Sequence, residues 1–191
     1  MGFRSVSSGV SGTIDIGSSA TNRNISSAAL YTYIDLANSA NLDGEITSVG
    51  VWANTAMTGF RVGTFYLVSG TTYRCRDSAT IGAVTAGSEQ TFAGLNIDVK
   101  KGDFIGCYYA TGKIEWSSSG GSGVRATGSA GEFIDKNDET SYGIFTGEAM
   151  SLYGTGVELV GRSLGAEFKF YPYTYPLVYP TAQARELSNP S

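Results

Sequence analysis

One stretch of this sequence, FAGLNIDVKKGDFIGCYY at residues 92–109, constrains the fold more than any other. Apolar and polar residues alternate over residues 96–99, which is the two-residue period of a half-buried strand. A turn is expected next, because Gly102 tolerates positive φ and Asp103 can hydrogen-bond its own backbone. Residues 104–109 then form a nearly continuous apolar run, typical of a strand covered on both faces. The stretch therefore predicts two strands folded back on each other, at the centre of two packed sheets.

The rest of the chain repeats this pattern of strand, glycine turn and strand. The clearest alternation of apolar and polar residues covers 59–69, and shorter strands are expected at 30–36, with Tyr31 and Tyr33 on one face, and at 46–53 and 113–116. No amphipathic helix of useful length precedes residue 180. Many short strands with frequent glycine turns predict an all-β fold: a two-sheet antiparallel β-sandwich, jelly-roll-like, with extended N- and C-terminal arms.

The composition divides the chain into three parts. Residues 1–29 are rich in Ser and Gly, with one alternating piece at 13–16, and predict an N-terminal arm that carries a short strand. Residues 30–165 are expected to form the β-sandwich domain. A break follows, because every glycine lies at or before Gly165 and all four prolines lie after it. Residues 166–191 therefore form a separate aromatic and proline-rich C-terminal arm.

The C-terminal arm is too apolar to lie free in water. Its prolines fix φ and keep it extended, and an apolar segment of this kind is expected to pack against protein. It could fold back on its own domain or dock on a neighbour, and we favour the neighbour. The expected oligomer contacts are aromatic: Phe168, Phe170, Tyr171, Tyr173, Tyr175 and Tyr179.

Charge and residue usage exclude several function classes. The net charge is −4 and the 13 basic residues are mostly scattered, whereas nucleic-acid binding needs concentrated positive charge. No segment has the apolar length of a membrane span, so neither nucleic acid nor membrane is an expected partner. The chain has no histidine, which removes the commonest general base and zinc ligand. We therefore expect no enzyme activity and no cofactor.

Motif searches agree with this expectation. The chain has no G-x-S-x-G motif, and its Gly121-Ser122-Gly123 segment lacks the third glycine of a nucleotide-binding loop. Thr13-Ile14-Asp15-Ile16-Gly17 resembles the centre of the laminarinase-type E-x-D-x-E strand, but Thr13 and Gly17 replace both glutamates. Cys75 and Cys107, the only cysteines, are expected to be small buried residues, with a disulfide as the alternative.

A sugar could bind where Glu115 and Trp116 adjoin at a strand end. Trp can stack on a sugar face while Glu binds its hydroxyl groups, and Tyr108 or Tyr109 could contribute. The competing interpretation is that Trp116 is a packing residue at the rim of the sandwich. Carbohydrate binding is therefore kept as the alternative function.

The acidic segment at residues 131–142 offers a candidate calcium site. Asp135, Asn137 and Glu139 present oxygen ligands at alternate positions, as calcium loops do. The EF-hand pattern fails beyond them, because Thr140 replaces the required glycine and Thr146 the bidentate glutamate. A solvated acidic turn is favoured over a metal site.

Several segments together resemble a known β-rich domain. They are ITSVGVWANTAMTGFRVGTFYLVSGTTYRCRDSATIG, GLNIDVKKGDFIGCYYATGKIE and GEAMSLYGTG, and the likeness covers roughly residues 12–160. Across them the chain is similar to a domain that recurs in predicted structural proteins of tailed bacteriophages and in metagenomic sequences. The resemblance implies a virion component such as a capsid decoration, head fibre or tail surface module. It carries no catalytic residue over to this chain.

The sequence thus predicts a non-enzymatic structural protein at a virion surface, with an extracellular location as the alternative. The expected partners are further copies of the chain, with a trimer as one option, and a capsid or tail protein. The negative net charge favours an outer position over contact with a packaged genome.

Overall fold

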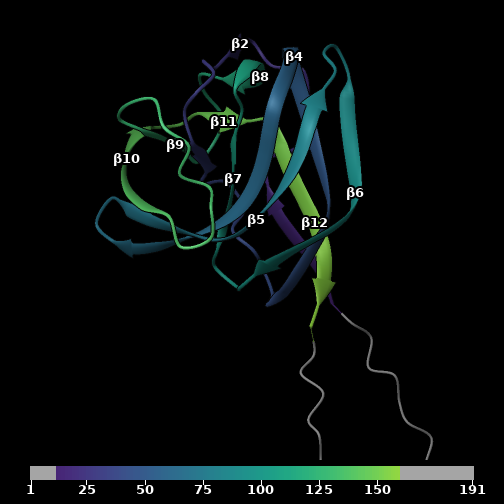
Figure 1. Ribbon diagram of the computed structural model, residues 1–191, viewed down its shortest axis with the longest axis vertical. Helices are drawn as coiled ribbons and strands as arrows, with labels where there is room; N and C mark the ends of the chain where they lie inside the picture. Colours follow the sequence, from purple (N-terminus) through teal and green to yellow (C-terminus); the bar gives the residue numbers. More distant parts are fainter. Residues whose placement is uncertain (1–11, 160–191) are drawn as a thin grey trace, which may run out of the picture. The chain divides into compact units, whose positions relative to one another are not determined.

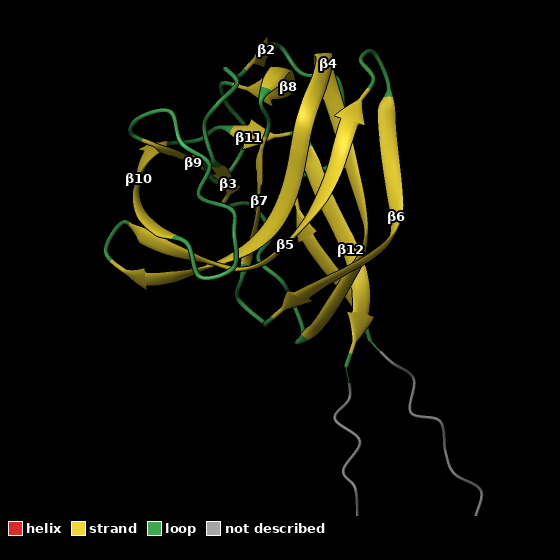
Figure 2. Cartoon of the chain, in the orientation of Figure 1, coloured by secondary structure: helices red, strands yellow, loops and turns green. Residues whose placement is uncertain are grey.

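The computed structural model describes residues 12–159. This part of the chain is all-β and contains no helix (Figure 2). It therefore has no helix that is long and apolar enough to cross a membrane. Every pair of neighbouring strands is antiparallel. The all-β antiparallel prediction is confirmed. The strands are β1 (Thr13–Gly17), β2 (Ile25–Ser26), β3 (Tyr33–Asp35), β4 (Gly44–Ser69), β5 (Thr72–Val84), β6 (Glu89–Val99), β7 (Phe104–Tyr108), β8 (Thr111–Ser117), β9 (Val124–Thr127), β10 (Glu139–Phe145), β11 (Ala149–Met150) and β12 (Leu152–Glu158).

The long strand β4 connects the whole body (Figure 1). Its first half pairs with β6 and β12, its middle with β8, and its second half with β5 and β7. The sequence predicted two strands here, at 46–53 and 59–69. Residues 54–58 contain neither Gly nor Pro, so the chain stays extended. The direction of β4 changes instead at register shifts, one of which lies between Met57 and Phe60, next to Gly59 with φ of 62°.

The second half of β4 belongs to a closed ring of pairings. The order β4, β5, β10, β9, β3 and β7 returns to β4, because β7 pairs with both β3 and β4. Closure of this kind leaves no unpaired sheet edge within the ring. It also places residues far apart in sequence, such as Ile34 and Gly106, side by side.

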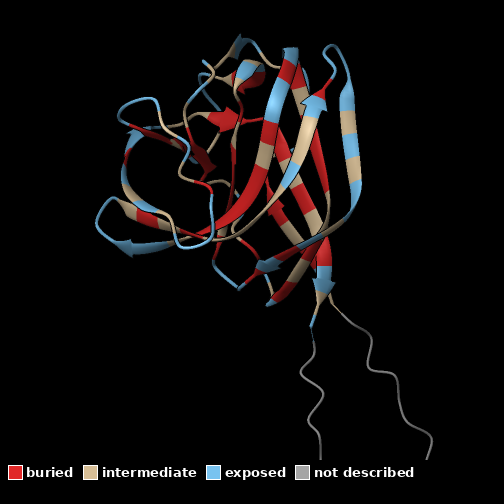
Figure 3. Cartoon of the chain, in the orientation of Figure 1, coloured by how far each residue is buried: buried red, intermediate tan, exposed pale blue. Residues whose placement is uncertain are grey.

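Buried side chains cover both faces of β7. Ile105, Cys107 and Tyr109 pack in the larger hydrophobic cluster, while Phe104 and Tyr108 pack against a smaller one. The prediction that residues 104–109 form a strand covered on both faces is confirmed. Two hydrophobic clusters on opposite faces of shared strands are consistent with a β-sandwich. Figure 3 shows in red the segments of β4 that are buried.

The predicted hairpin of residues 92–109 is correct in its turn and wrong in its pairing. Gly102 has φ of 91°, and the Asp103 N–H donates to the Lys100 carbonyl at 2.9 Å, as a turn requires. However, β6 pairs with the first half of β4, and β7 with the second half and with β3. Asp103 is 2% exposed, and its carboxylate is bound by Arg76 of β5. This contact fixes the turn in the body and directs the chain away from β6.

Residues 12–29, predicted as part of an arm, belong to the folded body. β1 pairs with β12, and Ile14 and Ile16 are fully buried, because apolar residues at every second position of a strand share one face. The predicted short strand at 13–16 is therefore present, but as part of the core. Residues 1–11 and the C-terminal arm, with its six aromatic candidates from Phe168 to Tyr179, lie outside the described residues.

Candidate functional site

The described body has an apolar depression of about 580 Å³ between β2, β3, β8, β9 and β10. We call it the aromatic hollow. These strands are far apart in sequence and meet on one side of the molecule (Figure 1). The lining residues are Ile25, Ser26, Ser27, Ala28, Tyr31, Tyr33, Trp116, Ala126, Thr127, Gly128, Gly143, Ile144, Phe145 and Glu148.

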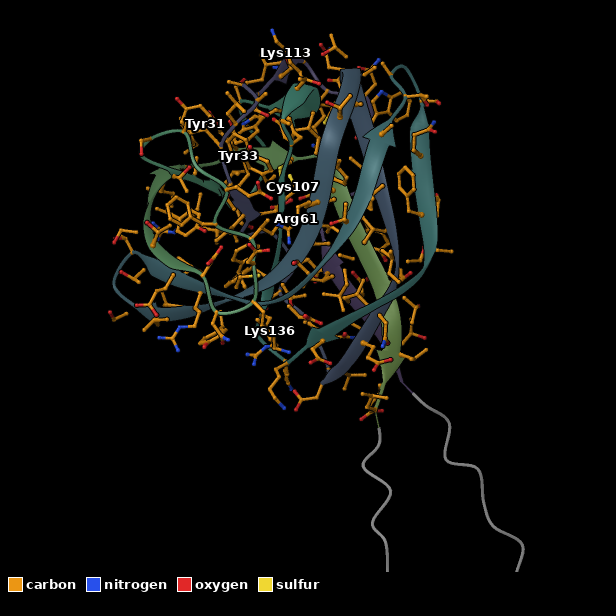
Figure 4. All side chains as sticks on the ribbon, viewed as in Figure 1. Tyr31, Tyr33, Arg61, Cys107, Lys113 and Lys136 are labelled. Atoms are coloured by element: carbon orange, nitrogen blue, oxygen red, sulfur yellow. The ribbon has the colours of Figure 1, made fainter. Side chains whose placement is uncertain are left out.

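Four aromatic rings in the wall contact one another in sequence. Tyr31 lies 6.2 Å from Tyr33 between ring centroids, and Figure 4 labels the two residues close together. The strand predicted over residues 30–36 is shorter in the structure, because β3 begins at Tyr33 and Tyr31 precedes it. Tyr33 meets Trp116 edge-on at 5.2 Å, and Trp116 meets Phe145 edge-on at 5.8 Å. Edge-to-face contacts of this kind stabilise the rings against one another. The rings are therefore held in place by one another without a ligand.

Strand pairing places the indole at the base of the wall. Trp116 in β8 lies between Ile25 of β2 and Met150 of β11, and only 3% of it is exposed. Phe145, which ends β10, is 48% exposed, and Ile144 beside it is 50% exposed. The hollow thus has a buried aromatic base and an exposed apolar rim.

One charged side chain lines the hollow. The Trp116 indole N–H donates to the Glu148 carboxylate, which fixes that carboxylate against the aromatic base. Two hydroxyl groups nearby are bound within the protein: Tyr33 donates to the Ala28 carbonyl at 2.8 Å, and the hydroxyl of Ser27 bonds that of Tyr109. The buried Thr127 Oγ1 in the same lining has no hydrogen-bond partner. Burial raises the pKa of the Tyr33 hydroxyl above its ordinary value, so it remains neutral.

Glu115 and Trp116, the pair predicted to bind a sugar, lie on opposite faces of β8. Glu115 and Trp116 are neighbours in β8, so their side chains point to opposite faces. Glu115 is 3% exposed and accepts hydrogen bonds from the Arg23 backbone N–H at 3.1 Å and from Asn54 Nδ2 at 2.8 Å. It holds the β1–β2 connection to the core, and only Trp116 lines the hollow.

The two tyrosines considered with them do not line the hollow either. Tyr109 is fully buried, and Tyr108 packs against the smaller hydrophobic cluster. The sequence prediction missed Phe145 and Glu148, which lie in a short glycine-flanked segment, GIFTGE. Ile144 and Phe145 are two adjacent apolar residues, and nothing local indicated which strand this segment would join.

The acidic segment does not assemble the predicted calcium ligands. Asp135 is bound by Arg61 of β4 at 2.7 Å, and Glu139 is bound by Arg74 of β5. Asn137 occupies a turn position with φ of 76°. Within residues 12–159 no group of three acidic, cysteine or histidine side chains could hold a metal ion. These carboxylates instead clamp the loop onto the ring, because arginines from two ring strands bind them (Figure 4 labels Arg61).

A second depression, of about 420 Å³, is charged and internally paired. The Arg76 guanidinium lies over the Tyr66 ring at 4.6 Å and is bound by Asp103. Lys136 lies 3.7 Å from Asp98 across the same depression. Each positive group there has a partner, so this depression presents no uncompensated charge.

The two cysteines are buried free thiols, as predicted. Burial raises the pKa of the Cys75 thiol to about 12, and it also raises the pKa of Cys107. Thiols are the unreactive form of cysteine, so neither residue is a nucleophile at neutral pH.

Comparisons with known proteins add no relative: no family model, no curated protein and no solved structure matches this chain. What the chain does is therefore inferred from its own residues.

Proposed function

We propose that this chain is a non-enzymatic building block of a multi-copy assembly, at a virion surface or a similar position, and that residues 166–191 join it to a second copy. A capsid decoration, a head fibre or a tail surface module would use such a block. The proposal combines the resemblance of residues 12–160 with the arrangement of the folded body.

One observation carries the proposal: the first and last described residues lie at the same end of the body. Thr13 is paired with Val157 across β1 and β12, and the Glu158 N–H donates to the Gly12 carbonyl at 2.9 Å, so the two ends of the described residues lie side by side. Val157 is 44% exposed and Leu159 is 55% exposed at this end. Exposed apolar side chains of this kind support an interaction surface there.

Ionisable groups that bind other parts of the body also support a structural role. Arg61 binds Glu132 and Asp135 and so fixes a loop to the ring. Glu115 accepts two N–H groups and fixes the β1–β2 connection. Groups engaged in this way hold the fold, because removing one partner would leave a buried polar atom unsatisfied.

Sedimentation velocity on the full chain tests the proposal. The variant replaces Phe168, Phe170, Tyr173 and Tyr175 with serine, and the control replaces the exposed body residues Leu67 and Val68 with serine. We expect the unmodified chain and the control to sediment as oligomers and the aromatic variant as a monomer with unchanged circular dichroism. Identical oligomers in all three would refute the role of this segment.

Carbohydrate binding is the alternative function, and of its two predicted residues only Trp116 supports it. Trp116 does line a hollow, but Glu115 faces the other side of β8. A sugar would therefore have to bind Phe145, Tyr31 and Glu148 instead. Neutral sugars are accordingly included as competing ligands in the test that follows.

A further inference from the structure

We infer that the aromatic hollow binds an alkylammonium group, that is, a quaternary or methylated amine, with Glu148 as its counter-charge. The inference concerns the body alone and is independent of the proposed assembly. It rests on the rings that line the hollow, on the charge of Glu148 and on the hydrogen bonds that its polar groups already make.

The rings provide the first part of the argument. The faces of aromatic rings carry partial negative charge and attract cations within about 6 Å of the ring centre. Tyr31, Tyr33, Trp116 and Phe145 line one hollow, and each contacts the next at 5.2 to 6.2 Å. An alkylammonium group suits this wall because it is cationic and its surface is apolar.

Glu148 provides the second part. Neither lysine nor arginine lines the hollow, and within residues 12–159 the Glu148 carboxylate makes no ion pair, only the hydrogen bond from Trp116. The charged depression lined by Arg76 and Lys136 differs, since its cations and anions are paired. A negative charge held against aromatic rings favours a positive ligand.

The existing hydrogen bonds favour a cation over a neutral sugar. The Trp116 N–H is bound to Glu148, the Tyr33 hydroxyl donates to the Ala28 carbonyl, and the Ser27 hydroxyl is bound to Tyr109. The buried Thr127 Oγ1 in the lining has no hydrogen-bond partner and could bind one sugar hydroxyl. Most of the other hydroxyl groups of a sugar would still be desolvated without a partner in such an apolar wall, which costs free energy. A quaternary ammonium group has no hydrogen-bond donor to satisfy.

Titration with choline chloride tests the inference. A Trp52→Phe variant of the full chain leaves Trp116 as the only indole, so fluorescence reports on the hollow. Calorimetry on the unmodified chain repeats the measurement without that substitution. The matched ligand is dimethylbutanol, in which carbon replaces the ammonium nitrogen, and sodium chloride keeps the ionic strength constant. We expect saturable choline binding in the millimolar range, with dimethylbutanol about tenfold weaker.

Variants locate the site. Glu148→Gln keeps an acceptor for the indole and removes the charge, and Phe145→Ala removes an exposed ring; each should weaken choline binding about tenfold. Leu67→Ala, at an exposed apolar residue far along β4, should leave it unchanged. The inference is overturned if choline does not bind, if dimethylbutanol binds equally well, if both hollow variants bind like the parent, or if glucose or galactose binds in place of choline.

Discussion

Replacing Gly106 with alanine should strongly destabilise the body, because the ring closes at this glycine. Gly106 lies in β7, opposite Gly63 of β4 on one side and Ile34 of β3 on the other. A Cβ atom at position 106 would clash with the Tyr33 carbonyl oxygen and lie 2.6 Å from the Phe65 ring. Neither neighbour can move easily: the carbonyl is part of the ladder, and Phe65 is fully buried.

The expected cost follows from overpacking. Adding a methyl group to a tightly packed core costs about 1–3 kcal/mol. We expect the upper end, about 3 kcal/mol, because the obstacle includes main chain as well as a side chain. Gly143→Ala is the matched control: Gly143 lies in β10 of the same ring, and its added Cβ would have its nearest neighbour 3.8 Å away. This control should be neutral or stabilise the protein by up to about 1 kcal/mol.

Urea denaturation followed by circular dichroism measures both variants against the parent. The reasoning predicts a clear loss of unfolding free energy for Gly106→Ala alone. Equal stability of the two alanine variants would mean that β7 is not held between β3 and β4 at this spacing, and the closed ring would be refuted.

Three further predictions concern buried polar groups. Burial raises the pKa of the Asp35 carboxyl, so the folded state loses stability as pH rises above the ordinary aspartate pKa of about 3.9. The advantage of Asp35→Asn over the parent in urea denaturation should therefore grow as pH rises above about 4, and a pH-independent difference would contradict this. Cys75 and Cys107 should resist a thiol reagent in the native state and both react in urea; reaction of either in the native state counts against their burial. Asp103→Ala should cost about 3 kcal/mol in the same denaturation assay, since it leaves the partly buried Arg76 unpaired; a cost near zero would show that the turn is not anchored.

Local sequence pattern predicted several features of the fold correctly. Residues 104–109 are covered on both faces, Gly102 and Asp103 form the turn, and Tyr31 and Tyr33 lie in contact. These features depend on the residues themselves and on their immediate neighbours. They can therefore be derived from the sequence.

Strand pairing could not be predicted in the same way. Partners in a sheet are chosen by the packing of the whole body, so β6 and β7 separate although a good turn joins them. Residues 46–53 and 59–69 form one strand, β4, and not two. This also depends on a neighbouring strand, because β8 pairs with the segment between them.

The candidate site shows the same limit. The sequence indicated Trp116 correctly. The residue predicted beside it, Glu115, points to the opposite face of β8 and does not reach the hollow. Phe145 and Glu148 reach the hollow only because β10 pairs with β9 and the indole binds Glu148. Such contacts join residues distant in sequence, and no local pattern identifies them.

The solution mass of the intact chain tests the proposed function most directly. Light scattering over a dilution series gives this mass without any substitution. The account predicts a multiple of the 20.1 kDa chain mass that falls toward 20.1 kDa on dilution or on loss of the C-terminal aromatic residues. A mass of 20.1 kDa at every concentration would contradict it.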